Sequence, residues 1–423
     1  MAIHTILIGT LVLTPIAATA DWPQWRGAGR DGVVACGPAL ANAWPPDGPV
    51  RFWESEKLAD KVDEGSGGGY GSVVVVDDRV YLFVNRKFFK DDEDDPSAED
   101  IILCFDARTG RTVWKTTRSG AARNWGSSST PCVVGDRLFV VGGTGLVYCV
   151  DSDTGCIVWE SAPNEGPADV SSSVQIVDGK VIVMSGPLSA LDPQDGKVLW
   201  QQPAVMGREN STVTWDQNGQ PLLICNDKGS NKAVCVRPDD GSVVWSVDGG
   251  SWSTAVVAAN HLVVNGEKSL AAYRLEADGP KKLWAHEELM DRAASPLVYD
   301  GHVYHFGSRG TAACVELATG DIKWQEKISD AEISSPVVAD NKIFMSLGYA
   351  QKLLLAEATP DRYEPLAEVN LPVQRASSPA IVNGRLYMRL TYSVVCYDVT
   401  DGAAEARDDD RRQTTAALAG ADN

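Results

Sequence analysis

One short pattern recurs along this chain of 423 residues. It consists of an apolar strand, an Asp, a turn that ends in Gly, and a Trp four or five residues later. Its copies end at the following tryptophans: Trp114, Trp159, Trp200, Trp245, Trp284 and Trp324. The steps between them are 45, 41, 45, 39 and 40 residues. A period near 40 built from short strands indicates a β-propeller in which each repeat forms one four-stranded blade.

The rest of each repeat can be divided into strands. A repeat opens with a short apolar run, a two-residue turn and a second apolar run, as in residues 334–344. The turns are pairs such as Asp77-Asp78, Asp178-Gly179 and Asn383-Gly384, which tolerate positive φ and suit tight hairpins. A third strand follows, and the Asp-x-x-Thr-Gly turn leads into the fourth strand. A single blade cannot bury both of its faces, so the blades must stack around an axis.

The recurrent tryptophans are expected to fill the gaps between adjacent blades. One buried indole removes roughly 150–250 Å² from water, which makes it a strong contributor to such a contact. This predicted inter-blade set is Trp53, Trp114, Trp159, Trp200, Trp245, Trp284 and Trp324.

The two ends of the chain are predicted to meet in one blade. A seventh repeat, from Ser334 to about Leu366, lacks the Trp. An eighth repeat begins at Ser377 and stops near Asp398, before any Trp-bearing strand. Residues 47–53 match residues 278–284 in spacing, so the N-terminal segment should supply the missing outer strand. We therefore predict an all-β fold, an eight-bladed propeller without open sheet edges at its closure.

The segments outside the repeats suggest export. Residues 1–20 contain a short apolar core, a Pro at position 15 and an Ala-Thr-Ala ending that fits a secretory cleavage site. The core is too short to span a membrane. We predict a signal peptide over 1–20, an N-terminal extension over 21–46, the propeller over 47–402 and a disordered tail over 403–423. The mature protein should be soluble, monomeric, and periplasmic or extracellular.

Charge and cysteine placement exclude some classes of function. The formal net charge is −19, whereas a general nucleic-acid binder needs a basic surface. Of nine cysteines, five occupy nearly the same third-strand position in different blades, which is too far apart for a disulfide: Cys104, Cys149, Cys235, Cys314 and Cys396. These should be buried core residues. The redox state of Cys36, Cys132, Cys156 and Cys225 is left open.

The Asp-x-x-Thr-Gly-x-x-x-Trp unit, the Ser-Ser-Pro prelude and the eightfold count resemble the PQQ-like propeller superfamily over about residues 45–400. The opening sequence from Asp21 to Gly27, DWPQWRG, is similar to the start of exported PQQ-like repeat proteins. The superfamily contains quinoprotein alcohol dehydrogenases as well as BamB-like binding scaffolds.

The resemblance implies a choice between enzyme and scaffold. The enzymes carry a vicinal Cys pair on the quinone, a Ca²⁺ held by Glu, Asn and Asp, a catalytic Asp and a Trp beneath the ring. This chain has no adjacent cysteines and no C-x-x-C-H haem motif, although some related sugar dehydrogenases also lack the pair. We favour a non-catalytic, cofactor-free propeller that binds a protein partner, as in envelope assembly. The alternatives are a PQQ- and Ca²⁺-dependent oxidoreductase and a carbohydrate or small-ligand binder.

The loops that precede the first strands should converge on one mouth of the central channel. Aligning the repeats on their hairpin turns places Arg208, Arg292, Glu332 and Arg375 in register, and the same loops contain Trp125 and Trp252. Arg and aromatic side chains are the usual anchors of protein interfaces. We predict a polar ring that holds a peptide carboxylate or an acidic partner; ordinary solvated loop charge is the alternative.

Overall fold

A computed structural model describes most of the chain. The described residues are 21–58, 68–87, 97–121, 127–164, 172–207, 209–227, 229–291, 293–307, 309–330 and 334–405. The predicted signal peptide and most of the predicted C-terminal tail lie outside them.

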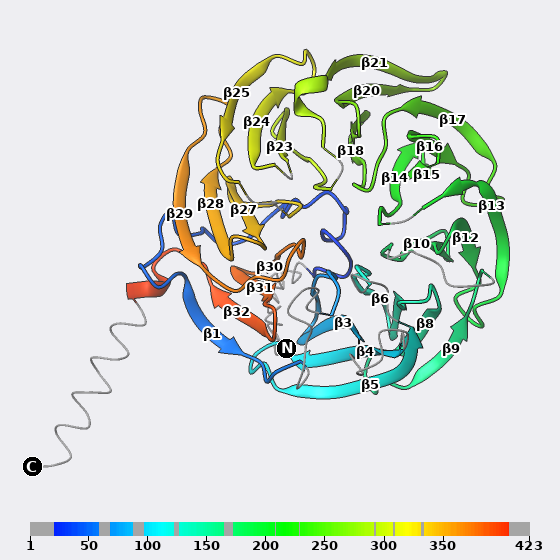
Figure 1. The fold of residues 1–423 in the computed structure, drawn as a ribbon, viewed down its shortest axis with the longest axis horizontal. Coiled ribbons are helices and arrows are strands. Elements are labelled where there is room, and N and C mark those ends of the chain that lie inside the picture. Colours follow the sequence, from blue (N-terminus) through cyan, green and yellow to red (C-terminus); the bar gives the residue numbers. More distant parts are fainter. Residues whose placement is uncertain are drawn as a thin grey trace, which may run out of the picture.

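The described residues form eight antiparallel sheets of four strands, arranged as the blades of a ring (Figure 1). Blades 1 to 4 consist of β2 (Val74–Val76), β3 (Arg79–Lys87), β4 (Ser97–Asp106) and β5 (Thr112–Ala121); β6 (Cys132–Val134), β7 (Arg137–Val141), β8 (Val147–Asp151) and β9 (Ile157–Ser161); β10 (Gln175–Val177), β11 (Lys180–Met184), β12 (Pro187–Leu191) and β13 (Val198–Met206); β14 (Val213–Gln217), β15 (Gln220–Asp227), β16 (Lys232–Val236) and β17 (Val243–Asp248).

Blades 5 to 8 repeat this arrangement. They consist of β18 (Val256–Ala258), β19 (His261–Asn265), β20 (Leu270–Glu276) and β21 (Gly279–His286); β22 (Leu297–Tyr299), β23 (His302–Phe306), β24 (Thr311–Glu316) and β25 (Ile322–Lys327); β26 (Val337–Ala339), β27 (Lys342–Leu347), β28 (Lys352–Glu357) and β29 (Pro365–Asn370); β30 (Ala380–Val382), β31 (Arg385–Arg389), β32 (Val394–Asp398) and β1 (Val50–Glu54). A short 3₁₀ helix, η1 (Glu287–Leu289), follows blade 5. No described helix has the length and apolar character needed to cross a bilayer.

The predicted closure is confirmed. Strand β1 pairs antiparallel with β32, with Val50 opposite Asp398 and Glu54 opposite Val395. The first and last parts of the propeller therefore share blade 8. The outer strand of blade 7, β29, is present and has no Trp, as the sequence indicated.

The hairpin turns adopt the predicted backbone conformation. Asp77, Asp178, Asp300 and Asn383 all have positive φ, between 44° and 51°. This left-handed region lets the short turn follow the twist of the strands, and Asp and Asn tolerate it better than most residues.

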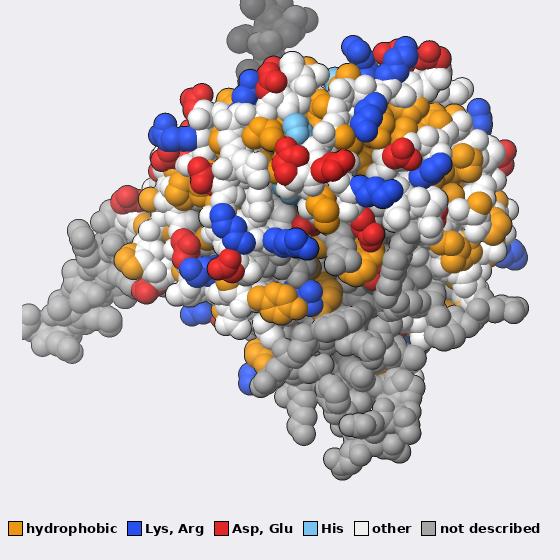
Figure 2. Space-filling view, turned by 45° about the horizontal axis from the view of Figure 1, so that its top comes forward, with side chains coloured by type: hydrophobic (Ala, Val, Ile, Leu, Met, Phe, Trp, Pro, Cys, Tyr) orange, Lys and Arg blue, Asp and Glu red, His pale blue; other side chains and the backbone are white. Residues whose placement is uncertain are grey.

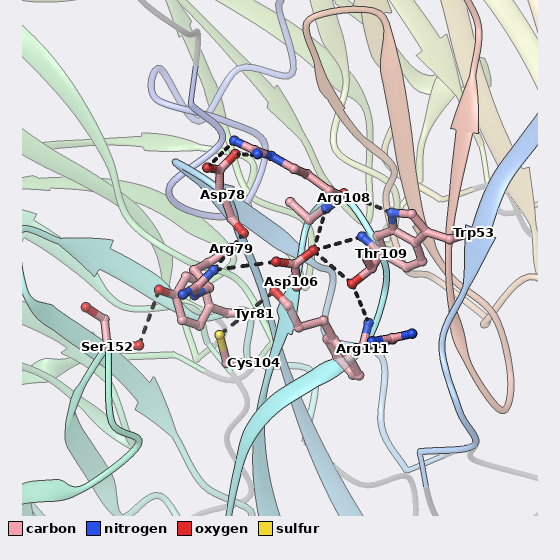
Figure 3. Close-up of polar contacts among 12 residues, drawn as sticks. Trp53, Asp78, Arg79, Tyr81, Cys104, Asp106, Arg108, Thr109, Arg111 and Ser152 are labelled. Carbon is pink, nitrogen blue, oxygen red and sulfur yellow. Dashed lines mark hydrogen bonds and ion pairs between the residues drawn. The ribbon is translucent and has the colours of Figure 1, made fainter.

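The Asp-x-x-Thr-Gly motif forms a local turn that is held by hydrogen bonds to its own Asp side chain (Figure 3). In blade 1, Asp106 Oδ1 accepts hydrogen bonds from the Thr109 backbone N–H (2.9 Å) and hydroxyl (2.9 Å) and from the Arg108 N–H (3.0 Å). The bond from the Thr109 hydroxyl is the main reason that the pKa of Asp106 lies below its usual value. Gly110 has φ +70°, and a β-carbon there would lie 2.4 Å from the Trp53 ring, so only Gly fits.

Most of the recurrent indoles join one blade to the next through this turn. The indole N–H donates to a backbone carbonyl of the following blade at 2.8–2.9 Å in six cases: Trp53 to Ala107, Trp114 to Ser152, Trp159 to Pro193, Trp200 to Pro238, Trp284 to Leu317 and Trp324 to Thr359. Among the described residues Trp245 has no such bond. The turn of blade 5 departs from the motif, and a β-carbon on its Gly279 would meet nothing within 4 Å.

The Ser-Ser-Pro prelude has a second role that the sequence did not reveal. The N–H of its second residue donates to the hydroxyl of the equivalent residue in the next blade, at 2.9–3.0 Å, for these pairs: Ser72 to Thr130, Thr130 to Ser173, Ser173 to Ser211, Ser211 to Thr254, Thr254 to Ser295, Ser295 to Ser335, and Ser378 to Ser72. We call this chain of bonds the hydroxyl ring. The first residue instead ties the loop to its own blade: the Val141 N–H donates to Ser129 Oγ at 3.1 Å.

The third-strand cysteines are free and buried, as predicted. The other four cysteines are also free; Cys132 and Cys225 are buried, and Cys36 and Cys156 are exposed.

Candidate partner-binding face

The strand order gives the ring two different faces. One face carries the hairpins between first and second strands and the Thr-Gly turns; we call it the hairpin face. The other carries the turns between second and third strands and the connections between blades; we call it the loop face. The predicted polar ring belongs to the loop face.

Only part of that predicted ring can be placed. Arg375 and Trp252 belong to the described residues, and both are partly buried. Arg208, Arg292, Glu332 and Trp125 lie outside the described residues. The ring as a whole therefore remains a prediction, and the described site is built around Arg375.

Arg375 lies between two tyrosine rings. Its guanidinium carbon is 4.5 Å from the centroid of the Tyr349 ring and 5.3 Å from that of Tyr70. Its Nη1 also donates to the Tyr70 hydroxyl at 3.2 Å. A cation over an aromatic face is attracted by the ring quadrupole, so the three side chains hold one another in place. We call them the Tyr-Arg-Tyr cluster.

The cluster joins three blades. Tyr349 comes from the turn between β27 and β28 of blade 7, Arg375 from the loop before β30 of blade 8, and Tyr70 from the loop before β2 of blade 1. Tyr349 is 64% exposed, the largest value among the exposed large apolar side chains of the described residues. An exposed aromatic ring whose position is fixed by a neighbour is a suitable interface anchor, because little conformational entropy is lost on binding.

The backbone around the cluster is strained. Gln351 and Ala376, which are neither Gly nor Asn, have φ of 50° and 56°. Residues held in this region usually cost of order 1 kcal/mol or more and concentrate at functional sites. The two loops also approach closely, since a β-carbon on Gly348 would lie 2.3 Å from Arg375 Cα. The loops carrying Tyr349 and Arg375 are thus tightly interlocked.

The N-terminal extension is not a simple linker but crosses the central channel (Figure 1, dark blue). Trp22 pairs with Val75 of β2 through two backbone bonds, of 2.7 and 2.9 Å. Farther along, the Val34 N–H donates to the Val338 carbonyl of β26 at 2.9 Å. Because β2 and β26 belong to blades 1 and 7, this segment contacts inner strands on separate parts of the ring.

Two buried arginines fix the crossing segment. Arg26 Nη2 donates to the carbonyls of Pro296 (2.9 Å) and Pro336 (3.3 Å), and Arg30 Nη1 donates to that of Val174 (2.8 Å). Both side chains are 1% exposed. Burial lowers the pKa of each guanidinium to about 10, so both remain charged at neutral pH.

The described residues contain no group of three or more His, Cys, Asp or Glu side chains placed to hold a metal ion. The crossing segment also fills part of the channel with Trp25 and the two arginines, whose guanidinium carbons lie 5.6 and 5.9 Å from the Trp25 ring.

The acidic charge is not concentrated on the visible surface. On the face shown in Figure 2, acidic and basic side chains alternate with apolar ones, and no large field of one sign appears.

Comparison with known proteins agrees with this architecture. The family model described as outer membrane protein assembly factor BamB matches residues 46–228 and 186–405. The chain belongs to this BamB family. The two matched ranges together span the propeller, so the assignment covers the whole ring.

Individual BamB relatives are distant in sequence. The Yersinia pestis BamB is 24% identical over 346 residues, covering 76% of this chain and 81% of that protein. The Escherichia coli BamB is 23% identical over 292 residues, covering 63% and 73%. The match to the Shewanella oneidensis BamB spans 64% of that protein, just under two thirds.

Solved structures share the fold. BamB from Moraxella catarrhalis aligns with a TM-score of 0.62 and 14% identity, covering 81% of this chain and 97% of that one. Quinohemoprotein alcohol dehydrogenase from Comamonas testosteroni aligns with a TM-score of 0.64 and 13% identity, covering 90% and 80%. This BamB and this alcohol dehydrogenase therefore share the fold, and function has to be argued from the site.

Proposed function

We propose that this BamB-family propeller is an exported, non-catalytic scaffold that binds a protein partner on its loop face and assists envelope protein assembly. The observation that carries the proposal is the Tyr-Arg-Tyr cluster, in which an exposed aromatic anchor and an arginine are held rigidly at a junction of three blades. The names of the curated relatives supply the assembly context.

The cluster favours a partner that offers a carboxylate beside an apolar group. Arginine presents a planar set of donors that matches a carboxylate, and the tyrosine rings supply apolar contact area. Arg208, Arg292 and Glu332, in register with Arg375, would extend the contact around the channel mouth.

Charge reversal at Arg375 tests this proposal. Arg375→Glu should lower retention of the partner from an envelope extract at least tenfold, because it replaces the cation and breaks both cation–aromatic contacts. Arg362→Glu is the matched control, since Arg362 lies in the same blade as Tyr349 but in a turn of the hairpin face, with a side chain that is 72% exposed. Equal retention by wild type and the Arg375 variant would show that the cluster is not the partner site.

A titration with PQQ, with and without Ca²⁺, separates the scaffold from the oxidoreductase. The scaffold proposal expects no binding under either condition. Tight Ca²⁺-dependent binding would replace it with the enzyme alternative and direct attention to alcohol and sugar substrates.

A further inference from the structure

The seam between blades 7 and 8 lacks two contacts that join most other blades. Strand β29 has no Trp to dock on the turn of blade 8. The hydroxyl ring is also interrupted there: the described part of the chain shows no bond from the Ser335 N–H to the Ser378 hydroxyl. Ser378 Oγ is buried without any hydrogen-bond partner among the described residues. Contacts of another kind must therefore join blades 7 and 8.

The N-terminal extension bridges the seam instead. The Leu40 N–H donates to Asp340 Oδ2 of blade 7 at 2.7 Å. On the other side, the Ala41 N–H donates to the Val399 carbonyl at 2.9 Å, and the Asp401 N–H donates to the Ala39 carbonyl at 3.0 Å. These bonds join the end of blade 8 to the extension and, through it, to blade 7.

Side chains of the extension add to the bridge. The Trp44 ring lies 6.2 Å from that of Phe344 in blade 7. Gly48 packs so closely on β29 that a β-carbon there would lie 2.9 Å from Val369. Between them and the channel, residues 35–39 are exposed. Residues 34–38 and Leu40 border a groove of about 240 Å³ beside the hairpin turns of blades 6 to 8. Pro38 packs on the blade 8 turn, since a β-carbon on Gly384 would lie 2.8 Å from its Cγ, and the other exposed residues depend mainly on the anchors at either end.

The bridge and the channel segment belong to one continuous stretch of chain. Arg26, Arg30 and the pairing of Val34 with Val338 anchor it inside the channel, and residues 39–48 anchor it across the seam. Only residues 35–38 separate the two anchor regions, so displacement of one should pull on the other.

We propose that residues 22–48 form a single latch, which closes the channel and the seam between blades 7 and 8 together. Release of the channel segment then loosens this seam before any other. The groove beside residues 34–38 marks the place where the latch is least supported.

Hydrogen exchange of the folded protein tests the coupling. Arg26→Met combined with Arg30→Met removes the bonds to inner-strand carbonyls while keeping apolar side chains of similar length. The amides of Val75, Ala41 and Asp401 should then exchange at least tenfold faster than in wild type. That of Ser211, whose N–H donates to Thr254 between blades 4 and 5, should change less than twofold.

Two further measurements complete the test. Trp159→Ala, which weakens the seam between blades 2 and 3, should speed the exchange of the Thr130 amide, which bonds across that seam, and leave Ala41 and Asp401 unchanged. In the wild-type protein at low denaturant concentration, the amides of Val75, Ala41 and Asp401 should open with one shared free energy, below that of Thr130. The latch proposal is overturned if Val75 exchanges faster in the double variant while Ala41 and Asp401 do not, if all seams loosen equally, or if the wild-type openings are independent.

Discussion

Replacing Trp159 with alanine is expected to lower the free energy of unfolding by about 3–5 kcal/mol, the usual cost of truncating a large buried aromatic side chain. The Trp159 ring is 9% exposed, lies 5.9 Å from the Phe139 ring, and covers Gly196 of the next blade. Its N–H also donates to the Pro193 carbonyl at 2.9 Å, which would lose its partner. Chemical denaturation of the purified protein measures the effect.

Trp245→Ala is the matched control for this substitution. Trp245 occupies the same place in its repeat and contacts Trp215 of its own blade, with ring centroids 6.4 Å apart. It is only partly buried and, within the described residues, lacks the indole bond to the next blade. Trp245→Ala should therefore lower the free energy of unfolding by clearly less than Trp159→Ala does. Equal losses would mean that docking on the Thr-Gly turn contributes little to stability.

Acid is expected to destabilise the protein through His305. This side chain on β23 is 1% exposed, and its Nδ1 is buried without a hydrogen-bond partner among the described residues. Burial lowers its pKa to about 4, although the nearby Asp291 opposes the shift. In the unfolded chain His titrates near 6.5, so between these values the unfolded state binds more protons. Above pH 6.5 the neutral His305 does not lower the free energy of unfolding. As the pH falls below 6.5, protonation of this residue in the unfolded state lowers the free energy of unfolding, by roughly 3 kcal/mol at pH 4.

The His305 effect is measured as a difference between variants. His305→Gln should remove most of the extra acid sensitivity, seen by comparing denaturation at pH 7 and pH 4 with wild type. The comparison is needed because carboxyl groups titrate in the same range; the pKa of buried Asp100, for example, is raised by desolvation. His261→Gln should have a smaller effect, since its pKa is also lowered by burial but its ring is partly exposed. An unchanged pH dependence in His305→Gln would contradict this assignment.

The repeated strands and turns could be predicted because the same sequence pattern recurs in most blades. Asp106 and its equivalents build the same local turn in most blades, so one pattern identifies the strands before and after it. The match between residues 47–53 and 278–284 even identified the outer strand of blade 8. The prelude was also visible, but the role of Ser72 or Thr130 was not, because their bonds form between blades and leave no local signal.

Features that occur once could not be predicted in this way. Arg26 and Arg30 look like ordinary charged residues in an extension, and their burial depends on carbonyls about 140 to 310 residues away. Arg375 was found because it lies in register with other loops. Tyr349 was missed, since it comes from a different kind of turn. Tyr70 was missed because it lies one residue after Gly69, the position in register with Arg375. Only the three-dimensional structure brings these side chains together.

The most direct test of the central claim is site-specific photo-crosslinking in the organism that makes the protein. A photoreactive phenylalanine analogue replaces Tyr349 on the loop face or, as a control, Val134 on the hairpin face, which is 50% exposed. The account predicts one protein partner crosslinked from position 349, lost when Arg375 is changed to Glu and absent from position 134. Equal labelling from both positions, or a position-349 product that persists in the Arg375→Glu variant, would contradict it.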